Sequence, residues 1–182
     1  MAIVRAQETS SSTFRYNYQV FLSFRGEDTR KTFTDHLYTA LVQAGIRTFR
    51  DDDEIERGKK LELELRKAIQ HSRISIIVFS KNYASSKWCL DEVIMILEWS
   101  RSTSTSSGHK VLPIFYDVDP SDVRNQTGSI GEAFARYEKE LIGAEVEDEK
   151  KREWMEKVKG WKLALREVAN LTGMVLENQA NK

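Results

Sequence analysis

Five short apolar runs alternate with stretches of helical periodicity along this chain, and no other feature constrains its fold as strongly. We predict these runs to be strands; they are Tyr18–Ser23, Ile46–Arg50, Ile74–Ser80, Lys110–Tyr116 and Gly173–Glu177. Strands that alternate with helical segments are typical of α/β folds with a parallel sheet and right-handed crossovers. The sequence therefore predicts a flavodoxin-like three-layer sandwich, in which the five-stranded parallel sheet has the order 2-1-3-4-5.

Length and composition indicate one domain. The chain has 182 residues, 40% of them apolar, which suffices for a compact core. Its 28 basic and 28 acidic residues balance, so charge gives no reason to expect a nucleic acid or a membrane as partner. The single cysteine suits a reducing, intracellular setting, and we expect neither a signal peptide nor a membrane-spanning segment. We predict a flexible tail over 1–15, the domain over 16–177, and a tail or the start of a linker over 178–182.

The predicted strand order leaves a crevice at one edge of the sheet. In the order 2-1-3-4-5 the connections after the first and third strands diverge, and ligands of such folds bind where they part. The motif F-R-G-E-D-T-R (Phe24–Arg30) follows the first strand, and W-C-L-D-E (Trp88–Glu92) follows the third. Both motifs are therefore expected beside the crevice.

Glu92 stands out within the segment Ser85–Val93, which begins a predicted helix that runs to about Ser100. At 100° per residue it is the single charge in an otherwise apolar sector. The neighbours that form this sector are Trp88, Met95, Ile96 and Trp99. Burial raises the pKa of a carboxyl group unless a partner compensates, and such groups beside a crevice are candidate functional residues. Two other interpretations stay open: the helix reaches solvent at this point, or Glu92 pairs with Arg25 or Arg30.

The residues next to Glu92 are assigned ordinary roles. Asp91 has Lys87 and Glu98 among its helical neighbours, so we expect a solvated surface acid. Cys89 falls on the apolar arc of the helix, which favours packing over nucleophilic chemistry. The three histidines lack zinc-ligand spacing and are His36, His71 and His109.

The loop after the first strand has features of an anion site. Gly26 lets a ligand approach the backbone, Arg25 and Arg30 supply positive charge, and Asp28 or Thr29 can cap the following helix. The plainer interpretation is a capped helix start with surface charges. The acidic segment Asp51–Lys60 follows the second strand; it is expected to be solvated, yet it can fold over the crevice as a lid.

Four ordered motifs make the chain resemble a known family. They are Y-Q-V-F-L-S-F-R-G-E-D-T-R, T-F-R-D-D, S-K-N-Y-A-S-S-K-W-C-L-D-E and L-P-I-F-Y-D-V-D-P-S-D-V-R. Together they closely resemble the Toll/interleukin-1 receptor (TIR) domain found at the N-terminus of plant nucleotide-binding leucine-rich-repeat disease-resistance proteins. The resemblance covers roughly Asn17 to Glu177 and implies a flavodoxin-like fold.

The resemblance also implies an activity, namely cleavage of NAD⁺, with NADP⁺ as a further candidate substrate, into nicotinamide and ADP-ribose-type signals that trigger defence. Glu92 fills the position of the catalytic glutamate in the W-C-x-x-E pattern. The implied nucleotide-binding residues are Arg25, Gly26, Glu27, Asp28, Thr29, Arg30, Gly58 and Trp88. Neither a cofactor nor a metal is expected, because NAD⁺ is the substrate.

Plant relatives of this kind are expected to act inside the cell, in the cytoplasm and also the nucleus, and to self-associate. The implied surfaces are the first helix, where this chain has Asp35 and His36, and the C-terminal helix, so we expect a weak homodimer or a higher assembly. A non-catalytic scaffold that works by TIR–TIR assembly is the main alternative. A phospho-receiver domain is disfavoured, because it would place an aspartate where this chain has Ser80.

Overall fold

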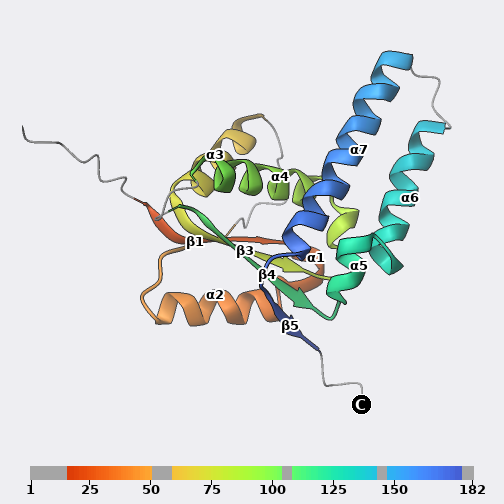
Figure 1. The fold of residues 1–182 in the computed structure, drawn as a ribbon. Helices are drawn as coiled ribbons and strands as arrows, with labels where there is room; N and C mark the ends of the chain where they lie inside the picture. The colour runs from red at the N-terminus through yellow and green to blue at the C-terminus, as the bar shows by residue number, and fades with distance from the viewer. Residues whose placement is uncertain (1–15, 51–58, 104–107, 143–146, 178–182) are drawn as a thin grey trace, which may run out of the picture.

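The computed structural model describes residues 16–50, 59–103, 108–142 and 147–177. Five parallel strands form one sheet of order β2-β1-β3-β4-β5, which confirms the predicted fold class (Figure 1). The strands are β1 (Tyr18–Phe24), β2 (Thr48–Arg50), β3 (Ser72–Phe79), β4 (Lys110–Tyr116) and β5 (Met174–Leu176). Because β1 leads to β2 on one side and β3 leads to β4 on the other, the chain diverges at the carboxyl ends of β1 and β3.

Helices cover the two faces of the sheet unequally (Figure 1). Helix α2 (Phe33–Gln43) packs on one face by itself among the described residues. The opposite face carries α3 (Lys59–Gln70), α4 (Lys87–Ser102), α6 (Gly128–Ile142) and α7 (Asp148–Ala169). Three short helical turns complete the structure: α1 (Gly26–Thr29), η1 (Tyr83–Ser85) and α5 (Pro120–Asn125).

The central strands have side chains buried on both faces, which explains their nearly continuous apolar sequence. Along β1, Val20, Leu22 and Phe24 pack toward α2, whereas Phe21 packs in the core on the α4 side. Ser23 follows this alternation and also points to the α4 side, where its hydroxyl contacts α4. A polar side chain is thus placed in the larger of the two cores.

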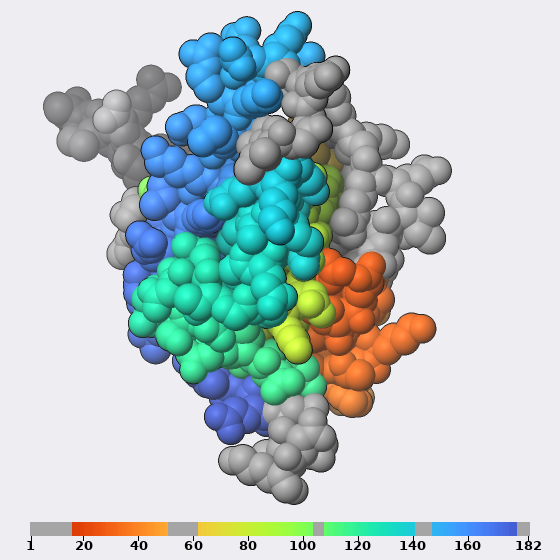
Figure 2. Space-filling view, turned by 90° about the vertical axis from the view of Figure 1, so that its right-hand side faces the viewer, coloured from red at the N-terminus to blue at the C-terminus, as the bar shows by residue number. Residues whose placement is uncertain are grey.

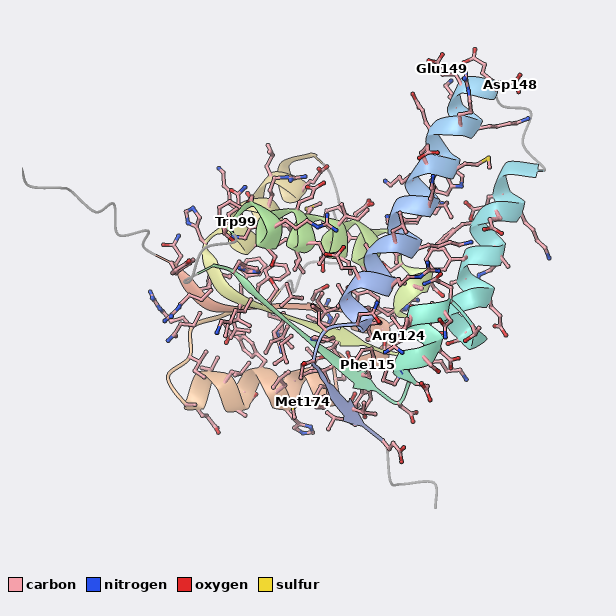
Figure 3. The ribbon with its side chains drawn as sticks, in the orientation of Figure 1. Trp99, Phe115, Arg124, Asp148, Glu149 and Met174 are labelled. Carbon is pink, nitrogen blue, oxygen red and sulfur yellow. The ribbon has the colours of Figure 1, made fainter. Side chains whose placement is uncertain are left out.

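The β4–β5 edge shows how a proline fits inside a strand. β5 pairs with β4 only from Ile114 onward, so this ladder starts just after Pro113. Gly173 lies against the proline, since a Cβ at this position would sit 2.5 Å from the Pro113 carbonyl oxygen. Figure 3 shows Phe115 and Met174 on these two adjacent strands.

The short helices α1 and α5 were not predicted, although α5 has a clear local signal. Asp119 caps α5 by accepting a hydrogen bond from the Ser121 amide at 2.7 Å, and Pro120 occupies the first turn. Arg124 at the end of α5 donates to the Ala169 carbonyl at 3.2 Å, which joins α5 to the last turn of α7 (Figure 3). None of the helices in the described part of the chain is long and apolar enough to cross a lipid bilayer.

Candidate active site

A pocket of about 610 Å³, counted out to its open mouth, lies at the end of β1 and beside the start of α4. The lining residues are Leu22, Phe24, Arg25, Gly26, Glu27, Arg30, Ser86, Trp88, Cys89 and Glu92. Figure 2 shows this end of the molecule, where residues 25–33 (red-orange) lie beside the segment just after residue 80 (yellow-green). The predicted crevice is therefore present, and both predicted motifs contribute to it.

The start of α4 fixes the position of its pocket residues. Ser86 has an extended backbone, and its hydroxyl accepts a hydrogen bond from the Cys89 amide at 3.3 Å, as expected of an N-cap serine. The Cys89 thiol donates to the Phe24 carbonyl at 3.6 Å, which ties the first turn of α4 to the end of β1. Cys89 is buried and packs in the core, as predicted.

The side chain of Glu92 is only 4% exposed, which confirms its predicted place in an apolar sector. The Ser23 hydroxyl donates a hydrogen bond to Glu92 Oε2 at 2.6 Å. Ser23 Oγ also lies 2.7 Å from the Tyr83 hydroxyl, and that hydroxyl lies 3.2 Å from the Cys89 carbonyl. The carboxylate is thus compensated by a serine hydroxyl, a partner that the sequence analysis did not consider.

Tyr83 is fully buried beside this carboxylate. Burial, together with the nearby Cys89 and Glu92, raises the pKa of the Tyr83 phenol well above its usual value, and the hydrogen bond between Tyr83 and Ser23 opposes the shift. Tyr83 is therefore a neutral phenol, able to donate a hydrogen bond, at every pH at which the protein would be assayed.

Two arginines place positive charge at the pocket. Arg25 forms an ion pair with the exposed Glu27, and its Nε lies 3.4 Å from Asp28 Oδ1. The guanidinium of Arg30 lies 5.2 Å from the centre of the Phe24 ring, in cation–π geometry. Arginines suit anionic groups such as phosphates, because the planar guanidinium offers several donors at once.

Two predicted nucleotide-binding residues, Asp28 and Thr29, are not among the residues that line the pocket. Asp28 accepts hydrogen bonds from the Ser80 hydroxyl at 2.5 Å and from the Asn82 amide at 3.0 Å, so it joins the loops after β1 and β3. Thr29 is buried, with its hydroxyl 2.7 Å from that of Thr34.

Neither Asp28 nor Thr29 caps the helix that follows β1, so the predicted capping role is wrong. Thr32 occupies the N-cap of α2, without a side-chain cap bond. Gly58 and the acidic residues Asp51–Glu54 lie outside the described residues.

The prediction that Asp91 is a solvated surface acid is wrong. Its Oδ1 accepts a hydrogen bond from the indole nitrogen of the fully buried Trp161 at 2.8 Å. Its Oδ2 lies 3.1 Å from Lys157 Nζ. The helical projection failed because α7 packs over a second side of α4 and covers the face assigned to solvent.

Sequence reasoning missed Ser23, Tyr83 and Ser86 as parts of the site. A usable signal existed for Ser23, because a lone hydroxyl within a strand covered on both faces needs a buried partner. No comparable signal marks Tyr83, whose partner is 60 residues away. Among the described residues, no group of three or more histidine, cysteine or acidic side chains is placed to hold a metal ion.

Comparison with known proteins identifies the family. The family model described as TIR domain matches residues 17–182. The chain belongs to the TIR domain family. It is 55% identical over 156 residues to disease resistance protein RPV1 of Vitis rotundifolia and 49% identical over 165 residues to TMV resistance protein N of Nicotiana glutinosa. These matches cover 86% and 91% of this chain but only 10% and 13% of the relatives, so this TIR domain spans about a tenth of their length.

A solved structure supports the same assignment. The TIR domains in the structure of the activated Roq1 resistosome, which directly recognises the pathogen effector XopQ, match with a TM-score of 0.72 and 49% identity. The match covers 90% of each chain. The chain is thus a TIR domain of the type found in plant disease-resistance proteins.

Proposed function

We propose that this TIR domain cleaves the bond between nicotinamide and ribose in NAD⁺, with Glu92 as the catalytic residue. The observation that carries the proposal is a carboxylate that is 4% exposed and yet lines an open pocket beside two arginines. Placing a charge in such a setting costs free energy, so an acid there is a candidate for chemistry.

The residues of the pocket suit this reaction. Nicotinamide in NAD⁺ already carries a positive charge and leaves without protonation, so the second carboxyl group of ordinary glycosidases is not needed. The Glu92 carboxylate can stabilise the positive charge that develops on the ribose as the bond breaks. Arg25 and Arg30 supply the charge that the pyrophosphate requires, and Trp88 offers an aromatic wall. Water completes the reaction to ADP-ribose.

A role in immune signalling follows from the relatives. The relatives are plant disease resistance proteins, and the TIR domains of Roq1 were solved within an activated resistosome. We propose that this domain likewise acts within a longer intracellular receptor and is activated by assembly with other TIR domains. The alternative, a scaffold that assembles without catalysis, is favoured by the same resistosome match and requires no chemistry at Glu92.

One assay separates the two functions. Glu92→Gln keeps the shape of the side chain and removes its charge, and we expect release of nicotinamide from NAD⁺ to fall by about 100-fold or more. Glu98→Gln is the matched control, because Glu98 lies on the same helix, is exposed, and pairs at the surface with Arg66 at 3.4 Å. Wild-type protein that leaves NAD⁺ intact at high concentration, or equal turnover in both variants, would reject the catalytic function.

A further inference from the structure

We propose that Ser23 and Tyr83 are positioning residues for Glu92, forming a buried hydroxyl relay that fixes the orientation of the carboxylate and keeps it charged. The inference rests on the proposed function of Glu92, but the geometry that carries it is independent of that function. Three elements contribute one residue each: Ser23 comes from β1, Tyr83 from η1 and Glu92 from α4. The relay therefore also holds the start of α4 against the centre of the sheet.

Counting protons fixes the direction of the hydrogen bonds. A charged carboxylate has no proton, so the 2.6 Å contact requires Ser23 to donate to Glu92 Oε2. A serine hydroxyl has one proton, so Ser23 must accept from Tyr83 across their 2.7 Å contact. Tyr83 can supply that proton because its phenol stays neutral. The chain from Tyr83 through Ser23 to Glu92 thus points its donors toward the carboxylate, and the Cys89 carbonyl, 3.2 Å from the Tyr83 hydroxyl, is the competing acceptor for the tyrosine proton.

Burial makes these hydrogen bonds strong and specific. Ser23 and Tyr83 are fully buried, and Glu92 is nearly so. Hydrogen bonds to a charged group in such surroundings are worth more than those at a surface, and neighbouring bonds strengthen each other. Because Oε2 is bonded to Ser23, the carboxylate is held in one orientation before substrate enters. This preorganisation places charge where the transition state needs it.

Charged and titratable groups also lie around Glu92. Arg25, Glu27 and Arg30 line the pocket from the loop after β1, and Cys89 lies on α4. Among them, Glu27 is paired with Arg25. The Cys89 thiol donates to the Phe24 carbonyl and not to the carboxylate. The Ser23 hydroxyl lies 2.6 Å from Oε2 and is the contact through which the relay acts on Glu92.

The competing view is that the two hydroxyls merely satisfy each other inside the core. Ser23→Ala and Tyr83→Phe distinguish the views, since each removes one hydroxyl and preserves the remaining packing. Ser75→Ala is the matched control: Ser75 is a fully buried serine on the neighbouring strand β3, and its hydroxyl lies 2.9 Å from His109 Nε2, outside the site. All three variants delete one buried hydroxyl, but only two of them delete it from the relay.

Steady-state kinetics with NAD⁺ give the first test. We expect Ser23→Ala to lower kcat by about 10- to 100-fold and to leave KM within about threefold, since the carboxylate acts on the transition state. Tyr83→Phe should lower kcat less, and adding it to Ser23→Ala should change little, because both act through one chain of hydrogen bonds. Ser75→Ala should retain wild-type kcat. A kcat for Ser23→Ala within about twofold of that of Ser75→Ala would overturn the relay.

A second readout needs no activity. Titration of the Glu92 side-chain carbon by NMR should show a midpoint at higher pH in Ser23→Ala than in wild type, because the lost donor favoured the charged form. Ser75→Ala should leave the midpoint unchanged. An unchanged midpoint in Ser23→Ala overturns the relay even if NAD⁺ is never cleaved, whereas a shifted midpoint without any cleavage supports the relay and rejects only the proposed function. If Ser23→Ala does not fold, the same two measurements on Tyr83→Phe decide.

Discussion

The indole nitrogen of Trp161 donates a hydrogen bond to Asp91 Oδ1 at 2.8 Å, and this contact joins α7 to the helix that carries Glu92. The Trp161 ring is fully buried, and Lys157, one turn earlier on α7, pairs with the second carboxylate oxygen at 3.1 Å. Two adjacent acids of one helix therefore serve different purposes. Asp91 anchors the helix to its neighbour, and Glu92 faces the pocket.

Truncating Asp91 should destabilise the domain without removing the proposed chemistry. In Asp91→Ala the buried Trp161 N–H loses its acceptor, so we expect the free energy of unfolding to fall by about 1–3 kcal/mol. Denaturant unfolding measures this change. Asp91→Asn is the control, because its amide oxygen can still accept from Trp161, and it should lose less than half as much. Equal losses in both variants would show that the ion pair with Lys157 dominates.

His109 should make stability depend on pH. It is buried; its Nδ1 donates to the Ser72 carbonyl at 2.8 Å, and its Nε2 accepts from Ser75. Burial lowers the pKa of His109 below its usual 6.5, while the bond to Ser72 opposes the shift. As pH falls below about 6.5, His109 binds a proton in the unfolded chain but not in the folded domain. The free energy of unfolding therefore decreases until the pH reaches the lower pKa of the folded state.

The test of this pH dependence is the free energy of unfolding between about pH 7.5 and 5. One proton of difference corresponds to about 1.4 kcal/mol per pH unit. His109→Gln should flatten the decline, and His36→Gln, at an exposed position on α2, should leave it in place. If the free energy of unfolding of His109→Gln decreased as much as that of the wild type, groups other than His109 would be responsible.

The fold was predictable because each strand and most helices carry a local pattern. The periods of two and 3.6 residues, together with the rule for crossovers, leave few topologies for five strands. The same logic placed Glu92 in an apolar sector and both motifs at one edge of the sheet. What it could not give were contacts between residues far apart in sequence. Ser23 and Glu92 are 69 positions apart, and Asp91 and Trp161 are 70 apart.

Asp91 illustrates why such contacts matter for a helical projection. The projection assumes one covered side, but α4 packs on the sheet and also against α7. Seven of its sixteen residues are buried as a result. The projection then assigns Asp91 to solvent, although the buried indole N–H of Trp161 donates a hydrogen bond to it. The loop residues Asp28 and Thr29 were assigned to the nucleotide site by resemblance; their hydrogen bonds to Ser80 and Thr34 were not predicted.

Arg30 should contribute to substrate binding more than to catalysis. Contacts to the pyrophosphate are the same before and during bond cleavage, so we expect Arg30→Ala to raise KM for NAD⁺ by about tenfold and to change kcat only a few-fold. Arg30→Lys keeps the positive charge but loses the planar guanidinium, which can donate two hydrogen bonds at once. We therefore expect its KM to lie between those of the wild type and Arg30→Ala. Arg73→Ala, at the opposite end of the sheet, is the distal control. A large loss of kcat with unchanged KM would contradict the binding role.

The last prediction concerns assembly through α2. The side chains of Asp35 and His36 are exposed, as expected for the implied surface, and so are those of Thr39 and Gln43. Asp35 is held by Arg50, whose guanidinium lies 2.9 Å from Oδ1 and also stacks 4.2 Å from the centre of the Tyr38 ring. This leaves His36 as an exposed contact residue beside an ordered ion pair. These four exposed residues of α2 are polar and offer no large apolar patch, so we expect a weak dimer that forms only at high concentration.

If assembly activates the domain, NAD⁺ cleavage per molecule should rise with protein concentration. We expect His36→Ala to weaken that rise while the activity at the lowest concentration stays the same, since His36 lies outside the pocket. Lys67→Ala, an exposed change on α3 across the sheet, is the control and should follow the wild type. Sedimentation velocity at the same concentrations reports the dimer directly. Specific activity that is flat over about a hundredfold range in all three proteins, while the dimer still forms, would separate assembly from catalysis.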